Sequence, residues 1–330
     1  MVLHDDSLLM RFKRYGIQIP VLDERSTTTM AELRRLLGSR GKWEAPFEPP
    51  LVTRADLERV HDADYVARLY NTDLESELLG CYELIRNGKP WRYCPELAEA
   101  PLTELFTTLL LHAGGSIQAG QLALDQGFCF FLGGGMHHAM PGYGEGFCLV
   151  NDIVVALSRL RSEGRAKRFW VIDIDAHKGD GTAVLCQNDP DCATLSIHMA
   201  HAWPLDEAPH DEAGRLKPSF VPSSVDIPIA YGEDSRYLPR LKQGLVELAE
   251  ILPDPDLVWV VAGADPYEYD ELPSTAGLRL SLPQMLSRDQ LVLDFLETRR
   301  LPSAWLMAGG YGGRSWEVYT QFLHWYHTRK

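Results

Sequence analysis

Short apolar runs alternate with helical segments from residue 128 onward, and this alternation limits the possible folds more than any other feature of the sequence. The runs are rich in β-branched and aromatic residues, as buried strands are, and cover residues 128–132, 168–174, 193–197, 225–229, 257–262 and 304–308. Helical spacing of apolar residues covers 151–163, 182–187, 235–251, 284–300 and 314–327. This order is typical of a mainly parallel sheet with helices on both faces. We therefore predict an α/β fold in which residues 1–330 form a single domain.

The N-terminal part of the sequence gives weaker signals. Residues 27–37 and 102–124 have the pattern of helices, and residues 53–70 predict either one helix or a pair. Residues 1–50 are otherwise mixed, and three prolines enforce a loop near residues 46–50.

Four of the predicted strands lead into segments that combine glycines with reactive side chains. These side chains are His137 and His138, then Asp173, Asp175 and His177, then Asp265, and finally Tyr311. In an open α/β sheet, ligands bind outside the carboxyl ends of the strands. The formation of a strand does not require reactive residues at its end. The agreement among four strands therefore predicts one shared site.

The segment FWVIDIDAHKGDG, residues 169–181, has the pattern of half a metal site. Side chains alternate along a strand, so Asp173, Asp175 and His177 point to the same side. A polar strand end capped by solvent is the alternative interpretation. With Asp265 as a further ligand, two carboxylates and one neutral imidazole would form a catalytic zinc site with an open position. Iron or manganese would accept the same ligands.

The adjacent histidines His137 and His138 allow three interpretations: they are surface residues, further metal ligands or catalysts. As catalysts they need carboxylates behind them, and Asp173 and Asp180 are the spare acids. Two such His–Asp dyads beside a metal-bound water would provide a base and an acid for hydrolysis. Tyr311 would place a phenol where an oxyanion develops, or it is an ordinary aromatic in a glycine turn. Together these residues predict metal-assisted hydrolysis of an amide.

The amino-acid composition limits which kinds of partner and which cellular compartment are compatible with the sequence. The formal net charge of -14, without a clustered basic face, argues against a nucleic-acid partner. Six cysteines are scattered without a C-x-x-C pair, which favours reduced, buried thiols. The charged N-terminus does not have the pattern of a signal peptide, and no apolar stretch approaches the length of a membrane span. We expect a cytoplasmic protein without a membrane partner, and an oligomer is compatible with the sequence.

The candidate residues lie within a series of motifs that resembles the zinc-dependent histone deacetylase superfamily. This superfamily includes acetylpolyamine amidohydrolase-like and acetoin-utilisation-type members. The motifs, in chain order, are ERVHDADYV, GGGMHHAMPGYGEGFCLVND, VIDIDAHKGDGTA, TLSIH, AGADPYEYDELP and AGGYGG. They extend over most of the chain, and their order makes the resemblance specific.

The resemblance implies an arginase/deacetylase-like three-layer fold with a central eight-stranded sheet and one Zn²⁺ per chain. The implied zinc ligands are Asp175, His177 and Asp265. Members of the superfamily also bind a monovalent cation such as K⁺, and its implied ligands here are Asp173, Asp175, His177, Ser196 and Ile197.

The resemblance also implies catalytic roles. His138, paired with Asp180, would be the general base. His137, paired with Asp173, would act electrostatically or as a proton donor. Tyr311 would polarise the acyl carbonyl.

The residues implied for substrate binding follow the superfamily pattern only in part. Gly146 and Phe147 match it and would line the narrow acyl-lysine tunnel. Tyr93 stands where many deacetylases have an Asp that grips the substrate backbone, and Leu272 matches the position of a Glu gatekeeper in polyamine-specific relatives. Lys178 replaces a second histidine outside the ligand set, so activity is expected to survive.

The leading hypothesis is a metal-dependent amidohydrolase that removes acetyl or another short acyl group from acyl-lysine or an acylated polyamine. A catalytically retired acyl-amine binding module is the non-enzyme alternative, although the ligands, the dyads and Tyr311 are all retained. A dimanganese ureohydrolase of the same fold would require further Asp or His ligands after residues 257–262, where Asp265 is followed by Pro-Tyr-Glu-Tyr.

Overall fold

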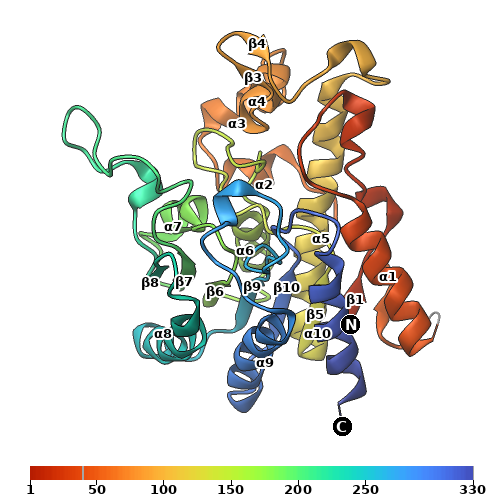
Figure 1. The fold of residues 1–330 in the computed structure, drawn as a ribbon, viewed down its shortest axis with the longest axis vertical. Coiled ribbons are helices and arrows are strands. Elements are labelled where there is room, and N and C mark those ends of the chain that lie inside the picture. The colour runs from red at the N-terminus through yellow and green to blue at the C-terminus, as the bar shows by residue number, and fades with distance from the viewer. Residues whose placement is uncertain (39–40, 330) are drawn as a thin grey trace.

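An eight-stranded sheet lies at the centre of the computed structural model, which describes residues 1–38 and 41–329 (Figure 1). Neighbouring strands pair in parallel in the order β2-β1-β5-β10-β9-β6-β7-β8. The strands are β1 (Val2–Leu3), β2 (Glu44–Ala45), β5 (Phe128–Phe131), β6 (Phe169–Asp173), β7 (Cys192–Met199), β8 (Val225–Ile229), β9 (Leu257–Val261) and β10 (Ser303–Leu306). A separate antiparallel hairpin consists of β3 (Ile85–Arg86) and β4 (Lys89–Pro90).

Helices cover both faces of this sheet, so the predicted three-layer α/β fold is confirmed. The helices are α1 (Glu24–Leu37), α2 (Arg54–Glu58), α3 (Ala63–Leu69), α4 (Leu74–Cys81), α5 (Leu105–Gln126), α6 (Asp152–Ser162), α7 (Asp180–Cys186), α8 (Tyr237–Ile251), α9 (Leu282–Thr298) and α10 (Trp316–Thr328). Side chains of the central strands alternate between two hydrophobic cores. Trp259 and Val261 pack on the side of α5 and α6, whereas Val258 and Val260 pack on the side of α8, α9 and α10. Because both faces are covered, these strands are apolar at consecutive positions.

The predicted elements differ from the observed ones mainly where they are short. β1 and β2 have two residues each, which is too short for a strand periodicity to appear in the sequence. Residues 53–70 form the pair α2 and α3, and Thr53 begins α2 in a capping box with Asp56. α7 begins at Asp180, two residues earlier than predicted, and this places Asp180 in its first turn.

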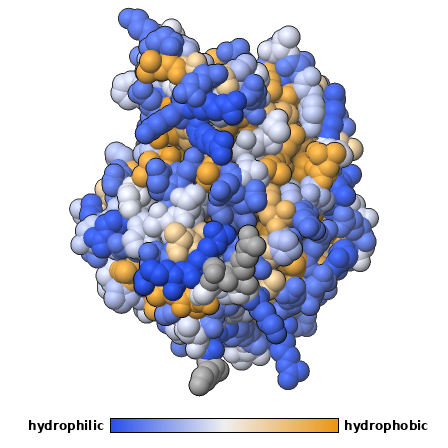
Figure 2. Space-filling view, turned by 90° about the vertical axis from the view of Figure 1, so that its right-hand side faces the viewer, coloured by the Kyte–Doolittle hydropathy of each residue, from blue (hydrophilic) through white to orange (hydrophobic). Residues whose placement is uncertain are grey.

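The surface carries a mixture of residue types. Figure 2 shows the side of the molecule on which α1 lies, where hydrophilic residues cover most of the face and hydrophobic residues form separate patches. Among residues 1–38 and 41–329, no helix combines the length and the apolar character that a bilayer span requires.

Candidate active site

The carboxyl ends of four neighbouring strands bring the predicted catalytic and metal-binding residues into one buried region. β5, β10, β9 and β6 are consecutive in the sheet, so the segments that follow them meet at one edge. The side chains there are at most 9% exposed, and they are His137, His138, Asp173, Asp175, His177, Asp180, Asp265 and Tyr311. Such burial of acids and histidines requires that they bind one another or a ligand.

The candidate metal centre consists of Asp175, His177 and Asp265, whose ligand atoms all lie within 4.8 Å of one another. Nδ1 of His177 is 2.9 Å from Oδ2 of Asp265 and 3.2 Å from Oδ1 of Asp175. Nε2 of His177 lies 2.8 Å from Oγ of Ser274. If Nε2 donates its proton to Ser274, the lone pair of Nδ1 faces the two carboxylates, as a metal ligand requires.

The main chain holds the two carboxylates of this centre in place. Gly309 N donates a hydrogen bond to Oδ2 of Asp175 at 2.9 Å, and Ala176 N donates to Oδ1 of Asp265 at 2.9 Å. A Cβ atom at Gly263 would lie 2.1 Å from Oδ2 of Asp175, so only glycine fits beside this carboxylate. Burial and the charge of Asp175 raise the pKa of Asp265 to about 8. Two carboxylates in this position would be stabilised by a cation, so the residues fit a divalent metal ion.

The two predicted His–Asp dyads are both formed. Nδ1 of His137 donates to Oδ2 of Asp173 at 2.6 Å, and Nδ1 of His138 donates to Oδ1 of Asp180 at 2.7 Å. The start of α7 packs closely against the histidine loop, because a Cβ atom at Gly181 would lie 2.4 Å from the carbonyl oxygen of residue 139. Each histidine therefore presents Nε2 to the site, while Nδ1 is fixed by its carboxylate.

The two histidines differ in electrostatic environment although their ring centroids are only 4.0 Å apart. Burial works to lower the pKa of His137, but the charges of Asp173 and Asp175 outweigh it and raise this pKa to about 9. Burial, together with the positive charge of His137, holds the pKa of His138 well below its usual value. These shifts favour a neutral His138, whose Nε2 carries a free lone pair, and a protonated His137.

Tyr311 is positioned by an acid that the sequence interpretation missed. Asp270 accepts hydrogen bonds from Tyr311 N at 2.7 Å, from Leu272 N at 3.0 Å and from Oγ1 of Thr275 at 2.9 Å. It therefore joins the segment after β10 to the segment after β9. Burial raises the pKa of Tyr311 well above its usual value, so the phenol stays protonated as a hydrogen-bond donor.

A cavity of about 250 Å³ leads from the surface to this region. Its lining includes the predicted residues Gly146, Phe147 and Leu272 and also Trp203. The Trp203 ring lies 4.5 Å from the His138 ring in an edge-to-face arrangement. A Cβ atom at Gly146 would lie 2.3 Å from Trp203, and Gly146 has a φ of +58°, so both space and backbone conformation require glycine there.

Two residues that contact the site histidines gave no recognisable signal in the sequence, and one predicted residue, Tyr93, lies elsewhere. Trp203 belongs to an irregular segment after β7, and Ser274 to a short 3₁₀ turn, so periodicity does not single them out. Asp270 could have been found as an Asx turn, since its carboxylate accepts from the amide two residues on. Tyr93 pairs with Ile17 in an isolated bridge, and the described lining of the 250 Å³ cavity does not include it.

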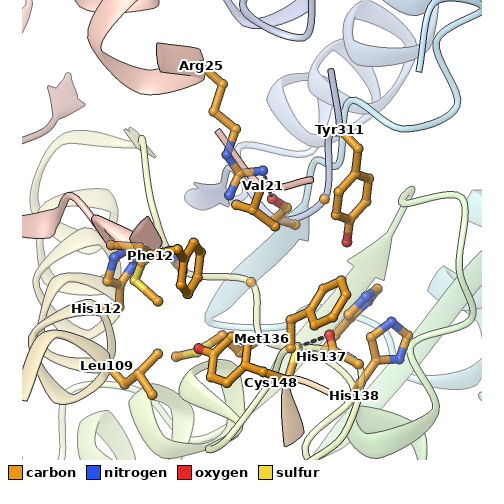
Figure 3. A pocket seen from close by; sticks show the side chains of 18 residues that line it. Phe12, Val21, Arg25, Leu109, His112, Met136, His137, His138, Cys148 and Tyr311 are labelled. Atoms are coloured by element: carbon orange, nitrogen blue, oxygen red, sulfur yellow. Dashed lines mark hydrogen bonds between the residues drawn. The ribbon is translucent and has the colours of Figure 1, made fainter. Parts of the chain in front are cut away.

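A second, smaller cavity of about 80 Å³ lies behind the histidines (Figure 3). Its walls are mostly apolar, with contributions from Met10, Phe12, Val21, Leu109 and Met136. Figure 3 shows the phenol oxygen of Tyr311 directed toward the two histidines, while Arg25 enters from α1. Nη1 of Arg25 donates to the carbonyl oxygen of Ala308 at 2.6 Å.

The residues implied for a monovalent cation also lie close together. Ser196 on β7 pairs in register with Asp173 on β6, and its Oγ accepts a hydrogen bond from Gly179 N at 3.3 Å. Ile197 follows on the same strand. Lys178 is buried with its Nζ 3.2 Å from Oδ1 of Asp226, so this side chain binds an acid on β8.

Comparison with known proteins identifies the family that this fold and site define. Residues 20–323 match the family described as the histone deacetylase domain. The chain belongs to this family, and the membership indicates a hydrolase of the deacetylase class.

Individual relatives agree with this assignment. The chain is 33% identical over 269 residues to an uncharacterized protein of Picosynechococcus sp., a match that covers 81% of this chain and 79% of that protein. It is 31% identical over 279 residues to the acetoin utilization protein AcuC of Bacillus subtilis, covering 82% of this chain and 67% of AcuC. The crystal structure of acetylpolyamine aminohydrolase from Burkholderia pseudomallei has a TM-score of 0.71 at 19% identity, covering 98% of this chain and 96% of that chain. This likeness confirms the deacetylase fold.

Proposed function

We propose that the protein is a metal-dependent amidohydrolase that removes acetyl or another short acyl group from the amine of acyl-lysine or an acylated polyamine. One observation carries this proposal: three candidate metal ligands, two His–Asp dyads and Tyr311 lie together beside a cavity that His138, His177 and Tyr311 line. The family match favours this reaction over that of a dimanganese ureohydrolase.

Asp175, His177 and Asp265 would hold the metal, which we propose to be Zn²⁺. The bound ion would supply Lewis acidity, which lowers the pKa of a water molecule and polarises the substrate carbonyl. Asp173, Asp175, His177, Ser196 and Ile197 are the proposed ligands of a structural monovalent cation such as K⁺.

The remaining side chains would move protons and stabilise charge. Nε2 of His138 would take a proton from the attacking water, because this ring is neutral and fixed by Asp180. His137, held protonated by Asp173, would stabilise the negative charge and donate its own proton to the leaving amine. The Tyr311 hydroxyl would donate a hydrogen bond to the carbonyl oxygen as it becomes an oxyanion.

The shape of the cavity supports an aliphatic amine as the substrate. Phe147 and Trp203 offer two aromatic walls for a methylene chain, and Gly146 allows the Trp203 ring to pack closely against the backbone. Leu272 adds a further apolar contact at the mouth. The acyl group would enter first and face the apolar cavity behind the histidines.

A paired assay tests the proposed function. The zinc-loaded protein is given an acetyl-lysine peptide and N-acetylputrescine, each with and without a chelator. Acetate release that the chelator abolishes, from either substrate, is the expected result. Protein with full zinc occupancy that releases acetate from neither substrate would contradict deacetylation and favour the binding-module alternative.

A further inference from the structure

An ion pair lies at the mouth of the 250 Å³ cavity, outside the catalytic region. Nη1 of Arg92 donates to Oε2 of Glu83 at 2.9 Å, and both residues line the cavity. The side chains are 28% and 49% exposed, respectively, so solutes can reach both. A positive and a negative group therefore lie side by side where the outer end of a bound substrate would be.

The backbone places Glu83 in a conformation that usually selects glycine. α4 ends just before it, Glu83 N bonds to the carbonyl oxygen of Gly80 at 3.0 Å, and φ of Glu83 is +52°. Glycine is the usual residue at such a left-handed helix end, because other side chains are strained there. Strained residues that persist are concentrated at functional sites. A glutamate at this position is consistent with a use for its carboxylate.

The pair is attached to the aromatic wall that leads to the reaction centre. Phe147 N donates to the carbonyl oxygen of Cys81 at 3.1 Å, and Trp91 N donates to that of Leu84 at 2.9 Å, which brings Arg92 opposite Glu83. Cζ of Arg92 is 5.7 Å from the centre of the Phe147 ring, and this ring is 6.4 Å from that of Tyr311. One aromatic ring thus separates the pair from the catalytic tyrosine. A four-carbon side chain spans roughly 6 Å, given C–C bonds of about 1.5 Å, which is comparable to the 6.4 Å between the Phe147 and Tyr311 rings.

We propose that this pair recognises the dipolar head of a free ω-acylated amino acid of the lysine type, an inference that rests on the proposed function. Glu83 would bind the α-ammonium group and Arg92 the α-carboxylate. Among residues 1–38 and 41–329, their mutual bond is the one side-chain hydrogen bond that either group makes. A carboxylate accepts up to four hydrogen bonds and a guanidinium donates five, so both retain capacity for a ligand. A peptide has no charge at these positions, and an acylpolyamine has cations alone.

Four substrates with the same scissile amide and chain length test the proposal. They are Nε-acetyl-L-lysine, N-acetylcadaverine, which lacks the carboxylate, 6-acetamidohexanoate, which lacks the ammonium group, and Nα,Nε-diacetyl-L-lysine amide, which lacks both charges. The expected kcat/KM is highest for free Nε-acetyl-L-lysine and falls roughly tenfold to a hundredfold for each charge removed, as for a lost charged hydrogen bond.

Single variants assign each charge to its partner. Arg92→Gln should lower kcat/KM for the two substrates with a carboxylate relative to N-acetylcadaverine. Glu83→Gln should lower it for the two substrates with an ammonium group relative to 6-acetamidohexanoate. Arg54→Gln is the matched control, since Arg54 forms an exposed ion pair with Glu58 at 2.7 Å within α2. This control should keep the wild-type order of the four substrates.

The outcomes separate this inference from the proposed function. Equal kcat/KM values for all four substrates, or a preference for N-acetylcadaverine, would overturn the dipolar site while leaving deacetylation in place. Selectivity that Arg92→Gln and Glu83→Gln do not change would also overturn it. Hydrolysis of none of the four by zinc-loaded protein would overturn the dipolar site, and the proposed function falls with it only if the acetyl-lysine peptide and N-acetylputrescine are not hydrolysed either.

Discussion

His138 and Asp180 are 42 residues apart in the chain, yet Nδ1 of one and Oδ1 of the other are 2.7 Å apart in the buried site. The bond exists because α7 starts at Asp180 and packs directly against the loop that follows β5. It fixes the tautomer of His138 and orients Nε2 toward the reaction centre. The proposed mechanism depends on this orientation.

Asp180→Asn should keep the metal but lower turnover by about two to four decades, the range that a general base contributes. An amide can donate as well as accept, so it no longer selects the tautomer with a proton on Nδ1. Acetate release and bound zinc are measured on the same preparation. Wild-type turnover with full zinc content would show that His138 does not act as the base.

Tyr311→Phe should retain zinc and lose about two to three decades of turnover, because one oxyanion donor is removed. The expected change is in kcat, since the hydroxyl interacts mainly with the transition state. Steady-state kinetics on the better substrate measure this. A variant with normal kcat would refute the role of the phenol.

Asp265→Ala should lose the metal itself, because it removes one of three protein ligands. Elemental analysis after gel filtration measures the zinc content. Asp211→Ala is the matched control, since Asp211 lies in an exposed turn where it binds Arg215. Full zinc occupancy in Asp265→Ala would mean that another residue is the third ligand.

Arg288→Met should destabilise the protein by about 3–5 kcal/mol, the effect of breaking a buried ion pair. Arg288 is fully buried, and its Nη1 donates to the carbonyl oxygens of Ile174 at 3.0 Å and Gly263 at 2.7 Å, beneath the metal centre. Its Nε donates to Asp289 at 2.8 Å, so the variant leaves an unpaired carboxylate. Urea denaturation measures the loss. A double variant Arg288→Met/Asp289→Leu should recover part of the lost stability. Equal stability of Arg288→Met and wild type would contradict a structural role of Arg288 in holding these carbonyl oxygens.

Glu145→Gln should stabilise the protein at alkaline pH but not at acidic pH. Burial, with the nearby charges of Asp180 and Glu83, raises the pKa of Glu145 to about 8 from 4.5. Between these two values the folded state keeps a proton that the unfolded state has released, so wild-type stability falls as pH rises through this window. Glutamine does not titrate, so the variant lacks this pH-dependent loss of stability. Its melting temperature should exceed that of wild type at pH 8.5 and approach it near pH 4.5, and a difference independent of pH would contradict the shift.

Sequence patterns predicted the parts of the molecule in which a repeating physical constraint acts. Strands such as β9 are buried on both faces, so Val258 and Trp259 are apolar although they point in opposite directions. Reactive residues at several strand ends predicted a shared site, because parallel strands present their carboxyl ends at one edge of the sheet. The same reasoning named Asp173 and Asp180 as acids for the two histidines, and Asp173 binds His137, the pairing that the family resemblance implied.

Residues that act through one long-range contact could not be predicted in this way. Trp203 reaches His138 from an irregular segment, and Ser274 binds His177 from a short turn 97 residues away. Glu83 and Arg92 meet only because the chain between them folds into a hairpin above Phe147. No periodicity marks such pairings, so they appear only when the fold is known.

The central claim is tested most directly by titrating metal-free protein with Zn²⁺. Acetate release is measured on the acetyl-lysine peptide or on N-acetylputrescine, whichever is the better substrate. The predicted result is no release without metal and a rise that saturates at one equivalent of zinc in wild type, with no rise in Asp265→Ala. Release that persists in metal-free protein, or its absence when one equivalent of zinc is bound, would contradict a metal-dependent deacetylase site at Asp175, His177 and Asp265.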